Sequence, residues 1–90
     1  MRGLLSEAAA WELDPQVAIR REPFGALAYH YGTRRLTFLR APELVALVES
    51  LGKFDSLDDA LAASTIAPER WPSFRKALVD LAATGVLRVR

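Results

Sequence analysis

The hydrophobic residues between Val17 and Leu39 follow a two-residue period that is interrupted twice. Successive side chains of a strand point to opposite faces, so this period is typical of strands. Pro23-Phe24-Gly25 and Gly32-Thr33 supply turn residues at the two interruptions. The connections are short, which favours antiparallel hairpins. The pattern therefore predicts three strands, over about residues 17–21, 26–31 and 34–39.

The same alternation predicts which side chains share a face of each strand. Leu27, Tyr29 and Tyr31 share one face of the second strand, and the opposite face carries Ala26, Ala28 and His30. Leu36 and Phe38 share a face of the third strand, and we expect this face to contact the helices. The outer edge of the third strand has no predicted neighbour. An open edge can pair with another chain unless it is protected.

The hydrophobic period becomes helical after Pro42, which suits the first turn of a helix that ends near Gly52. Ser56, with Asp59 three residues later, predicts the cap of a second helix. A third helix begins between Pro68 and Pro72 and stops at Gly85. Its core stripe consists of Trp71, Phe74, Leu78 and Leu81. Residues 87–89 can form a short final strand.

These elements predict an α+β domain with a winged-helix-like arrangement, in which a three-stranded antiparallel meander packs on three helices. The chain of 90 residues is 51% hydrophobic, which supports one packed core. Residues 1–14 have weak patterning and are interpreted as a flexible N-terminal arm, which leaves residues 15–90 as the domain. The alternative is that Trp11 packs on the domain or on a second copy of it.

The composition excludes most catalytic chemistry. The chain has no cysteine and a single histidine, His30, so it offers no histidine-based metal cluster. No serine lies near His30 in the sequence, so the sequence gives no sign of a catalytic triad. We therefore predict no enzyme activity, no metal and no cofactor. No apolar run approaches the roughly 20 residues that span a bilayer, so no membrane partner is expected. The absence of cysteine fits a reducing cytoplasm, where we place the chain.

Nucleic acid is not an expected partner, because the net charge is only +1. The cations of the third helix, Arg70, Arg75 and Lys76, are interrupted by Asp80. Two alternatives nevertheless stay open. One is a DNA-binding winged-helix protein, and the other is a dimerisation module in which a second copy fills the open strand edge.

One flank of the third helix could form the wall of a groove. Arg75, Val79 and Ala82 lie at roughly 80° to 140° from Phe74 around the helix axis. This flank is small and apolar with one cation. The other reading is that these residues are only the rim of a wide core stripe.

The run DPQVAIRREPFGALAYHYGTRRLTFL precedes a Pro-opened Leu/Val helix and a terminal helix that ends LAATGVLR. Together they resemble the mycofactocin precursor-peptide chaperones. These are leader-peptide recognition domains of ribosomally synthesised and post-translationally modified peptides, and they are similar to the pyrroloquinoline quinone peptide chaperone. The resemblance covers residues 11–90 and is most specific over EPFGALAYHYGTRRL. It implies a non-catalytic protein that binds the leader of a precursor peptide and presents it to a radical S-adenosylmethionine maturase.

The resemblance also implies where the leader binds: as an extra strand on the third strand, in the cleft beside the third helix. The peptide-binding residues expected on this sequence are Arg34, Arg35, Leu36, Thr37, Phe38, Leu39, Arg75, Val79 and Ala82. We expect the arginines to favour an acidic leader. We also expect the N–H of either Thr37 or Phe38 to point to the open edge, with proline at Thr37 as the first blocking substitution to test.

Overall fold

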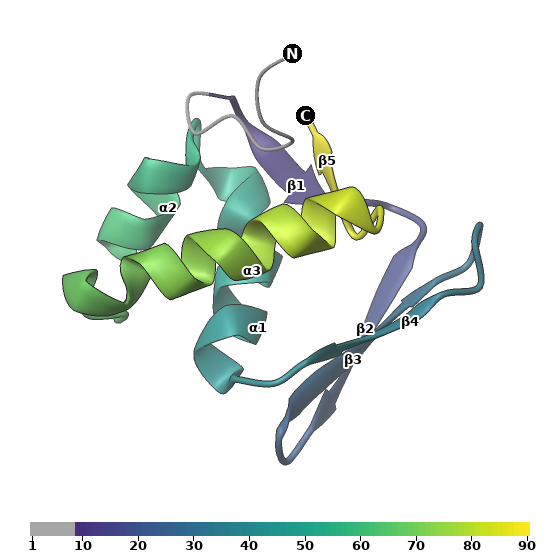
Figure 1. Cartoon of the computed structure of the whole chain (residues 1–90). Coiled ribbons are helices and arrows are strands. Elements are labelled where there is room, and N and C mark those ends of the chain that lie inside the picture. Colours follow the sequence, from purple (N-terminus) through teal and green to yellow (C-terminus); the bar gives the residue numbers. More distant parts are fainter. Residues whose placement is uncertain (1–8) are drawn as a thin grey trace.

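The computed structural model describes residues 9–90, which form two small sheets and three α-helices (Figure 1). The strands are β1 (Trp11–Leu13), β2 (Val17–Glu22), β3 (Gly25–His30), β4 (Leu36–Leu39) and β5 (Leu87–Val89). The helices are α1 (Pro42–Ser50), α2 (Leu57–Ala63) and α3 (Trp71–Ala83), with 3₁₀ turns η1 (Leu51–Lys53) and η2 (Pro68–Arg70). The predicted α+β class, with a three-stranded antiparallel sheet and three helices, is confirmed.

The main sheet is the predicted meander, with strand order β2-β3-β4 and antiparallel pairing throughout. Gly25 begins β3 opposite the end of β4. Its φ is +148°, and a Cβ atom at this position would lie 2.0 Å from the carbonyl oxygen of Leu39. Glycine is therefore what allows β4 to come this close to the β2–β3 turn.

The inner face of β3 carries small side chains at its centre. Ala26 and Ala28 are buried against the helices, and α1 lies against β3. In the register of the sheet, Ala28 is opposite Thr37 and Ala26 is opposite Leu39, so these β4 residues share the inner face.

The prediction that Leu36 and Phe38 face the helices is therefore wrong. Their side chains are 51% and 49% exposed, whereas that of Leu39 is fully buried. The reason is packing: the small face of β3 lets α1 approach, and the pairing register then carries the alternate residues of β4 to the outside.

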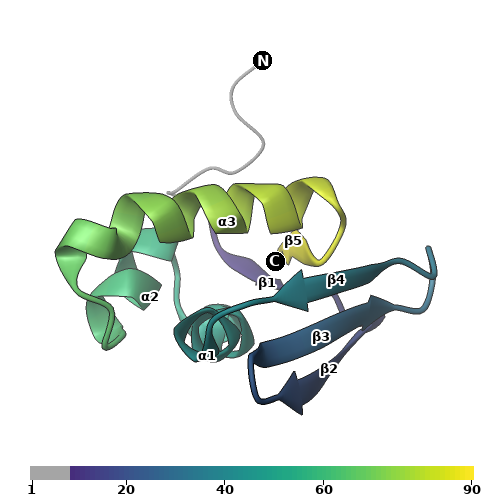
Figure 2. The same cartoon turned by 60° about the horizontal axis from the view of Figure 1, so that its bottom comes forward.

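The helices begin and pack as predicted. Pro42 opens α1, and the Ser56 hydroxyl caps α2 by accepting a hydrogen bond from the Asp59 N–H at 3.1 Å. The stripe of α3 is confirmed, since Phe74, Leu78 and Leu81 are buried and Trp71 packs partly buried beside them. Figure 2 shows α3 crossing over α1, with β4 as the sheet strand that faces α3. No helix in the described part of the chain has the length and hydrophobicity of a membrane span.

The predicted final strand forms, but it pairs outside the main sheet. β5 is antiparallel to β1, with Trp11 opposite Val89. Trp11 is only 5% exposed, and the Asp14 N–H donates to the Val86 carbonyl at 2.8 Å. The prediction of a flexible arm is therefore wrong for residues 11–13, because Trp11 packs on the domain and β5 supplies a pairing edge. The part of that prediction that concerns residues 1–8 lies outside the described residues.

Candidate functional site

Within residues 9–90, β4 pairs with another strand on one side only. The hydrogen bonds at its start show which backbone groups point outward. The His30 N–H donates to the Arg35 carbonyl at 3.0 Å, so these two residues form a hydrogen-bonded pair. Hydrogen-bonded and non-bonded pairs alternate in antiparallel strands.

This alternation assigns the backbone groups of β4. Those of Thr37 and Leu39 face β3, whereas the N–H and C=O groups of Leu36 and Phe38 face the open edge. The edge-facing N–H expected from the sequence is thus that of Phe38. A proline at Thr37 would instead remove a hydrogen bond inside the sheet, so the choice of Thr37 as the first blocking substitution is corrected.

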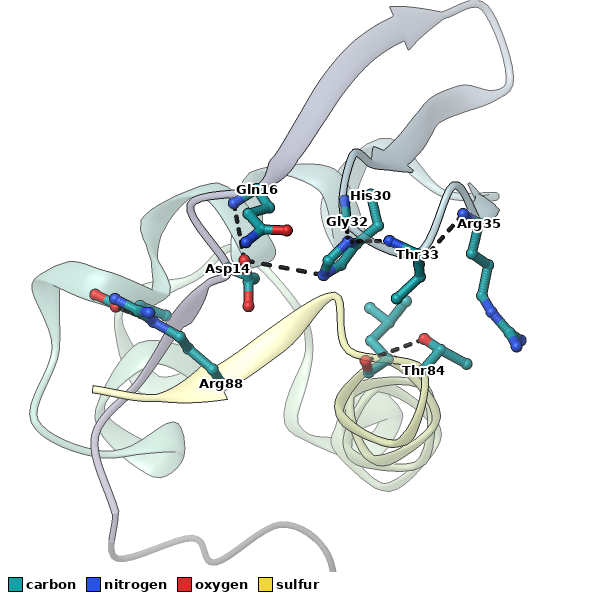
Figure 3. A network of polar contacts seen from close by, with 10 residues as sticks. Asp14, Gln16, His30, Gly32, Thr33, Arg35, Thr84 and Arg88 are labelled. Atoms are coloured by element: carbon teal, nitrogen blue, oxygen red, sulfur yellow. Dashed lines mark hydrogen bonds and ion pairs between the residues drawn. The ribbon is translucent and has the colours of Figure 1, made fainter.

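The turn before β4 is held by a buried imidazole (Figure 3). His30 Nδ1 accepts hydrogen bonds from the N–H groups of Gly32 at 3.0 Å and Thr33 at 3.1 Å. This places the ring proton on Nε2, which lies 3.9 Å from a carboxylate oxygen of Asp14. Arg34 adopts a left-handed φ of 62°, and its N–H donates to the His30 carbonyl. His30 therefore fixes the turn that starts β4.

Two adjoining hollows separate the open edge of β4 from α3. The first is lined by Thr37, Phe38, Leu39, Leu44, Ala77, Asp80, Leu81 and Thr84. The second is lined by Arg40, Ala41, Leu44, Ser73, Phe74 and Ala77. Leu44 and Ala77 line both hollows, so the two adjoin; we call them together the β4–α3 cleft. Its surface is mostly apolar, and Asp80 is its carboxylate.

The structure does not bring Arg75, Val79 and Ala82 to this cleft. Arg75 forms an ion pair with Asp58 of α2, and its guanidinium lies 5.9 Å from the centroid of the Trp71 ring. The flank that carries Arg75 therefore runs beside α2. The opposite flank of α3, with Ser73, Ala77, Asp80 and Thr84, faces β4. Helical periodicity identifies the buried stripe of α3 but does not show which of its two flanks faces β4. The sequence pattern therefore missed the α3 residues that line the cleft.

Cations mark both ends of β4. Arg34 and Arg35 lie before the strand and Arg40 follows it, all three exposed. Within the described residues, none of them has a carboxylate at ion-pair distance. The Arg40 guanidinium lies 5.2 Å from the centroid of the Phe38 ring. Asp80 on the cleft wall has Lys76 Nζ at 3.7 Å. The ends of the cleft are therefore the positions that would attract acidic groups.

A hydrogen-bonded carboxylate joins the two helices that line the cleft. Glu43, in the first turn of α1, accepts a hydrogen bond from Arg70 at 3.2 Å, immediately before α3 begins. The backbone N–H of Glu43 and then the Arg70 guanidinium hold the pKa of this carboxyl below its usual value. Among residues 9–90 no group of three His, Cys, Asp or Glu side chains could hold a metal ion. The cleft thus offers backbone pairing and apolar contact.

Comparison with known proteins gives a consistent result. The sequence profile of the peptide chaperone MftB family matches residues 10–88. The peptide chaperone MftB of Mycolicibacterium smegmatis is 41% identical over 78 residues, which is 87% of this chain and 76% of that protein. The Mycobacterium tuberculosis protein of the same name is 39% identical over 77 residues, covering 86% and 71% of the two chains. The Mycobacterium ulcerans protein of the same name is 38% identical in an alignment that covers 97% of this chain and 94% of that protein.

No solved structure matches this chain, and the winged-helix likeness is not confirmed. The family match spans nearly all the described residues. The family description names a peptide chaperone, a function without catalysis, in agreement with the prediction that the chain is not an enzyme. The chain belongs to the peptide chaperone MftB family.

Proposed function

We propose that this chaperone binds the leader of a mycofactocin precursor peptide by β-strand addition to β4 and presents it to a radical S-adenosylmethionine maturase. The observation that carries the proposal is the open edge of β4, where Leu36 and Phe38 direct their backbone groups along the β4–α3 cleft. A free edge beside an apolar groove is the arrangement that recognises extended peptides.

Backbone pairing sets the direction and register of the peptide. The N–H and C=O groups of Leu36 and Phe38 can make four hydrogen bonds, each worth about 0.5–1.5 kcal/mol net, or about 2–6 kcal/mol together. Association itself costs on the order of 4–15 kcal/mol. Hydrogen bonds to β4 therefore cannot hold the peptide without side-chain contacts.

Apolar leader side chains supply the remaining affinity. Every second side chain of an added strand points into the cleft, toward Leu44, Ala77 and Leu81. Burying about 400 Å² of apolar surface contributes about 10 kcal/mol. The leader should therefore carry apolar residues at a spacing of two, with a neutral or basic side chain opposite Asp80. Acidic residues flanking this segment would meet Arg34, Arg35 and Arg40, mainly to the benefit of association rate and specificity.

Proline at Phe38 tests the proposal. Phe38→Pro removes the edge-facing N–H and puts a ring methylene where the peptide should approach, yet leaves the bonds between β3 and β4 intact. Phe38→Ala is the matched control, because it removes the ring and keeps the N–H. Calorimetry with a synthetic leader peptide should show at least tenfold weaker binding for Phe38→Pro than for Phe38→Ala, with native-like amide spectra for both.

Two further results sharpen this test. Thr37→Pro should unfold or destabilise the sheet, because the Thr37 N–H faces β3. Amide hydrogen exchange should slow at Leu36 and Phe38 when the leader is added to the wild-type chain. Equal affinity of Phe38→Pro and Phe38→Ala, or new protection along β2 instead, would contradict strand addition to β4.

A further inference from the structure

The face of the main sheet that points away from the helices is apolar and uncovered. We call it the outer face; it carries Phe24, Leu27, Tyr29, Tyr31, Leu36 and Phe38. The described residues include five exposed large apolar side chains, and four of them lie here, with exposed fractions from 40% to 64%. This follows from the small inward side chains of β3, Ala26 and Ala28, because alternation then places Leu27 and Tyr29 outside. A contiguous exposed apolar patch of this kind is often a functional surface.

The side chains of the outer face are already ordered. The Phe24 and Phe38 rings stack with centroids 5.7 Å apart, and this contact joins the β2–β3 turn to β4. The Tyr29 and Tyr31 rings meet edge to face at 5.2 Å. A hollow lies on this face among Leu27, the two tyrosines and Leu36. A partner that docks here loses little side-chain entropy, because the aromatic groups are held by one another.

The size of the face argues against a second copy of this chain. Three strands about 4.8 Å apart and about six residues long span roughly 14 by 20 Å, or about 300 Å². A standard interface buries about 800 Å² on each partner. Two outer faces in contact would therefore bury too little for a stable dimer. The partner must reach beyond the sheet.

The charges around the face indicate the chemistry of that partner. Arg40 lies over the Phe38 ring, and Arg34 lies at the other end of β4; neither has an ion-pair partner among residues 9–90. Arg20 and Glu22 pair with each other on the β2 side at 2.6 Å. The rim is thus cationic, so two copies would repel and an acidic rim would be attracted.

We propose that the outer face docks a folded protein whose contact surface is apolar at the centre and acidic at the rim, and that this protein also covers the peptide strand on β4. The second part rests on the proposed function. A leader added to β4 would widen the sheet by about 4.8 Å and place every second side chain beside Leu36 and Phe38. The partner then reads chaperone and leader as one surface. It binds the loaded chaperone more tightly, and by linkage it raises the leader affinity by the same factor.

The experiment uses the maturase of the proposed function as the probe, with and without a synthetic leader. The variant Leu27→Thr/Tyr29→Thr removes the centre of the outer face on β3, keeps strand-compatible residues and leaves the cleft unchanged. Val89→Thr is the matched control, because Val89 is 58% exposed on β5. The wild-type chain should bind the maturase at least fivefold more tightly when loaded. The double variant should lose at least tenfold in maturase affinity, and its leader affinity without maturase should stay within twofold.

A second variant keeps the test decisive if the double variant does not fold. Arg20→Glu reverses a rim charge on β2, away from the cleft, and should weaken maturase binding at least threefold, with a smaller loss at high salt. Unchanged maturase affinity in the folded variants, or no binding of the wild-type chain to the maturase, would overturn the inference. So would self-association of the wild-type chain that Leu27→Thr/Tyr29→Thr abolishes while maturase binding persists. Failure of strand addition itself would instead appear in the leader calorimetry of Phe38→Pro.

Discussion

The two edges of the main sheet, formed by β2 and β4, differ in how they are protected. The Tyr31 N–H donates to the Gln16 carbonyl at 2.8 Å, so by alternation the backbone groups of Ile19 and Arg21 point outward from β2. The N–H of Val17, at the start of the strand, donates to the Asp14 carbonyl at 2.9 Å. At β4 the outward groups are those of Leu36 and Phe38. Both edges therefore present backbone hydrogen-bonding groups, and their side chains decide which one can bind a strand.

Charged side chains protect β2. Three of its six residues, Arg20, Arg21 and Glu22, are charged, and Arg21 pairs with Glu49 of α1. The four residues of β4 carry no charge within the strand. Charges along an edge disfavour pairing with another chain. The β4 edge lacks this protection and also has the apolar wall of α3 beside it. Of the two edges, β4 is therefore the one left available for a partner.

The largest effect on stability should come from a substitution that pushes β4 away from the β2–β3 turn. Gly25→Ala would put a Cβ atom 2.0 Å from the Leu39 carbonyl oxygen at a φ of +148°. We expect the free energy of unfolding to fall by at least about 2 kcal/mol, measured by urea denaturation.

Gly52→Ala is the control for this substitution. Its Cβ would meet the Glu12 Cβ at 3.6 Å, an ordinary contact, so its effect should stay below about 1 kcal/mol. Equal unfolding free energies for the two variants would show that β4 does not depend on this close approach.

A carboxylate in the cleft should block the peptide without unfolding the protein. Ala77 lines both hollows, so Ala77→Asp should weaken leader binding by about 30-fold, equivalent to about 2 kcal/mol. Val79→Asp is the matched control on the α2 side of the same helix and should stay within threefold. Calorimetry distinguishes the two. The opposite ranking would place the peptide on the flank that helical periodicity first indicated.

Charge reversal at the start of β4 should have a smaller effect. Arg34→Glu should slow leader association about fivefold at low salt and less at high salt, because exposed charges are screened. Lys53→Glu in η1 makes the same change in net charge, and Lys53 lines neither hollow. Stopped-flow measurements at two salt concentrations provide the rates. Equal slowing by both variants would assign the effect to net charge alone.

The smallest effect on leader binding should come from substitutions on β2, the protected edge of the sheet. Arg21→Pro removes an outward N–H from β2, and Arg21→Ala removes the same side chain without that loss. We expect the two variants to bind the leader with affinities within twofold of each other. A loss specific to Arg21→Pro would mean that the leader pairs with β2.

Much of the local structure was predictable because its causes are local. The turn residues before Gly25 and the glycine at Gly32 separate the strands, Pro42 opens α1, and Ser56 caps α2. The predicted third strand was two residues too long, because Arg34 adopts a left-handed φ in the turn that His30 holds. No pattern near Arg34 signals this conformation, since its cause is an imidazole buried against another part of the chain.

The candidate site was predictable only in part. The open edge of β4 follows from a meander that stops after three strands. The lining residues Ala77, Asp80 and Thr84 do not follow, because the stripe of α3 has two flanks of similar chemistry. The pairing of Trp11 with β5 joins segments at opposite ends of the chain, which no local pattern connects.

Local sequence patterns were enough to place the helices and the three strands of the main sheet to within about two residues, and to identify the buried face of each helix. These properties depend on residues a few positions apart. Three features depend on tertiary packing: the small face of β3 is the inner one, Phe38 and not Thr37 directs its N–H to the open edge, and Ala77 faces β4. The physical reason is that these choices depend on how closely α1 and α3 approach the sheet, and that distance is set by packing between segments far apart in sequence.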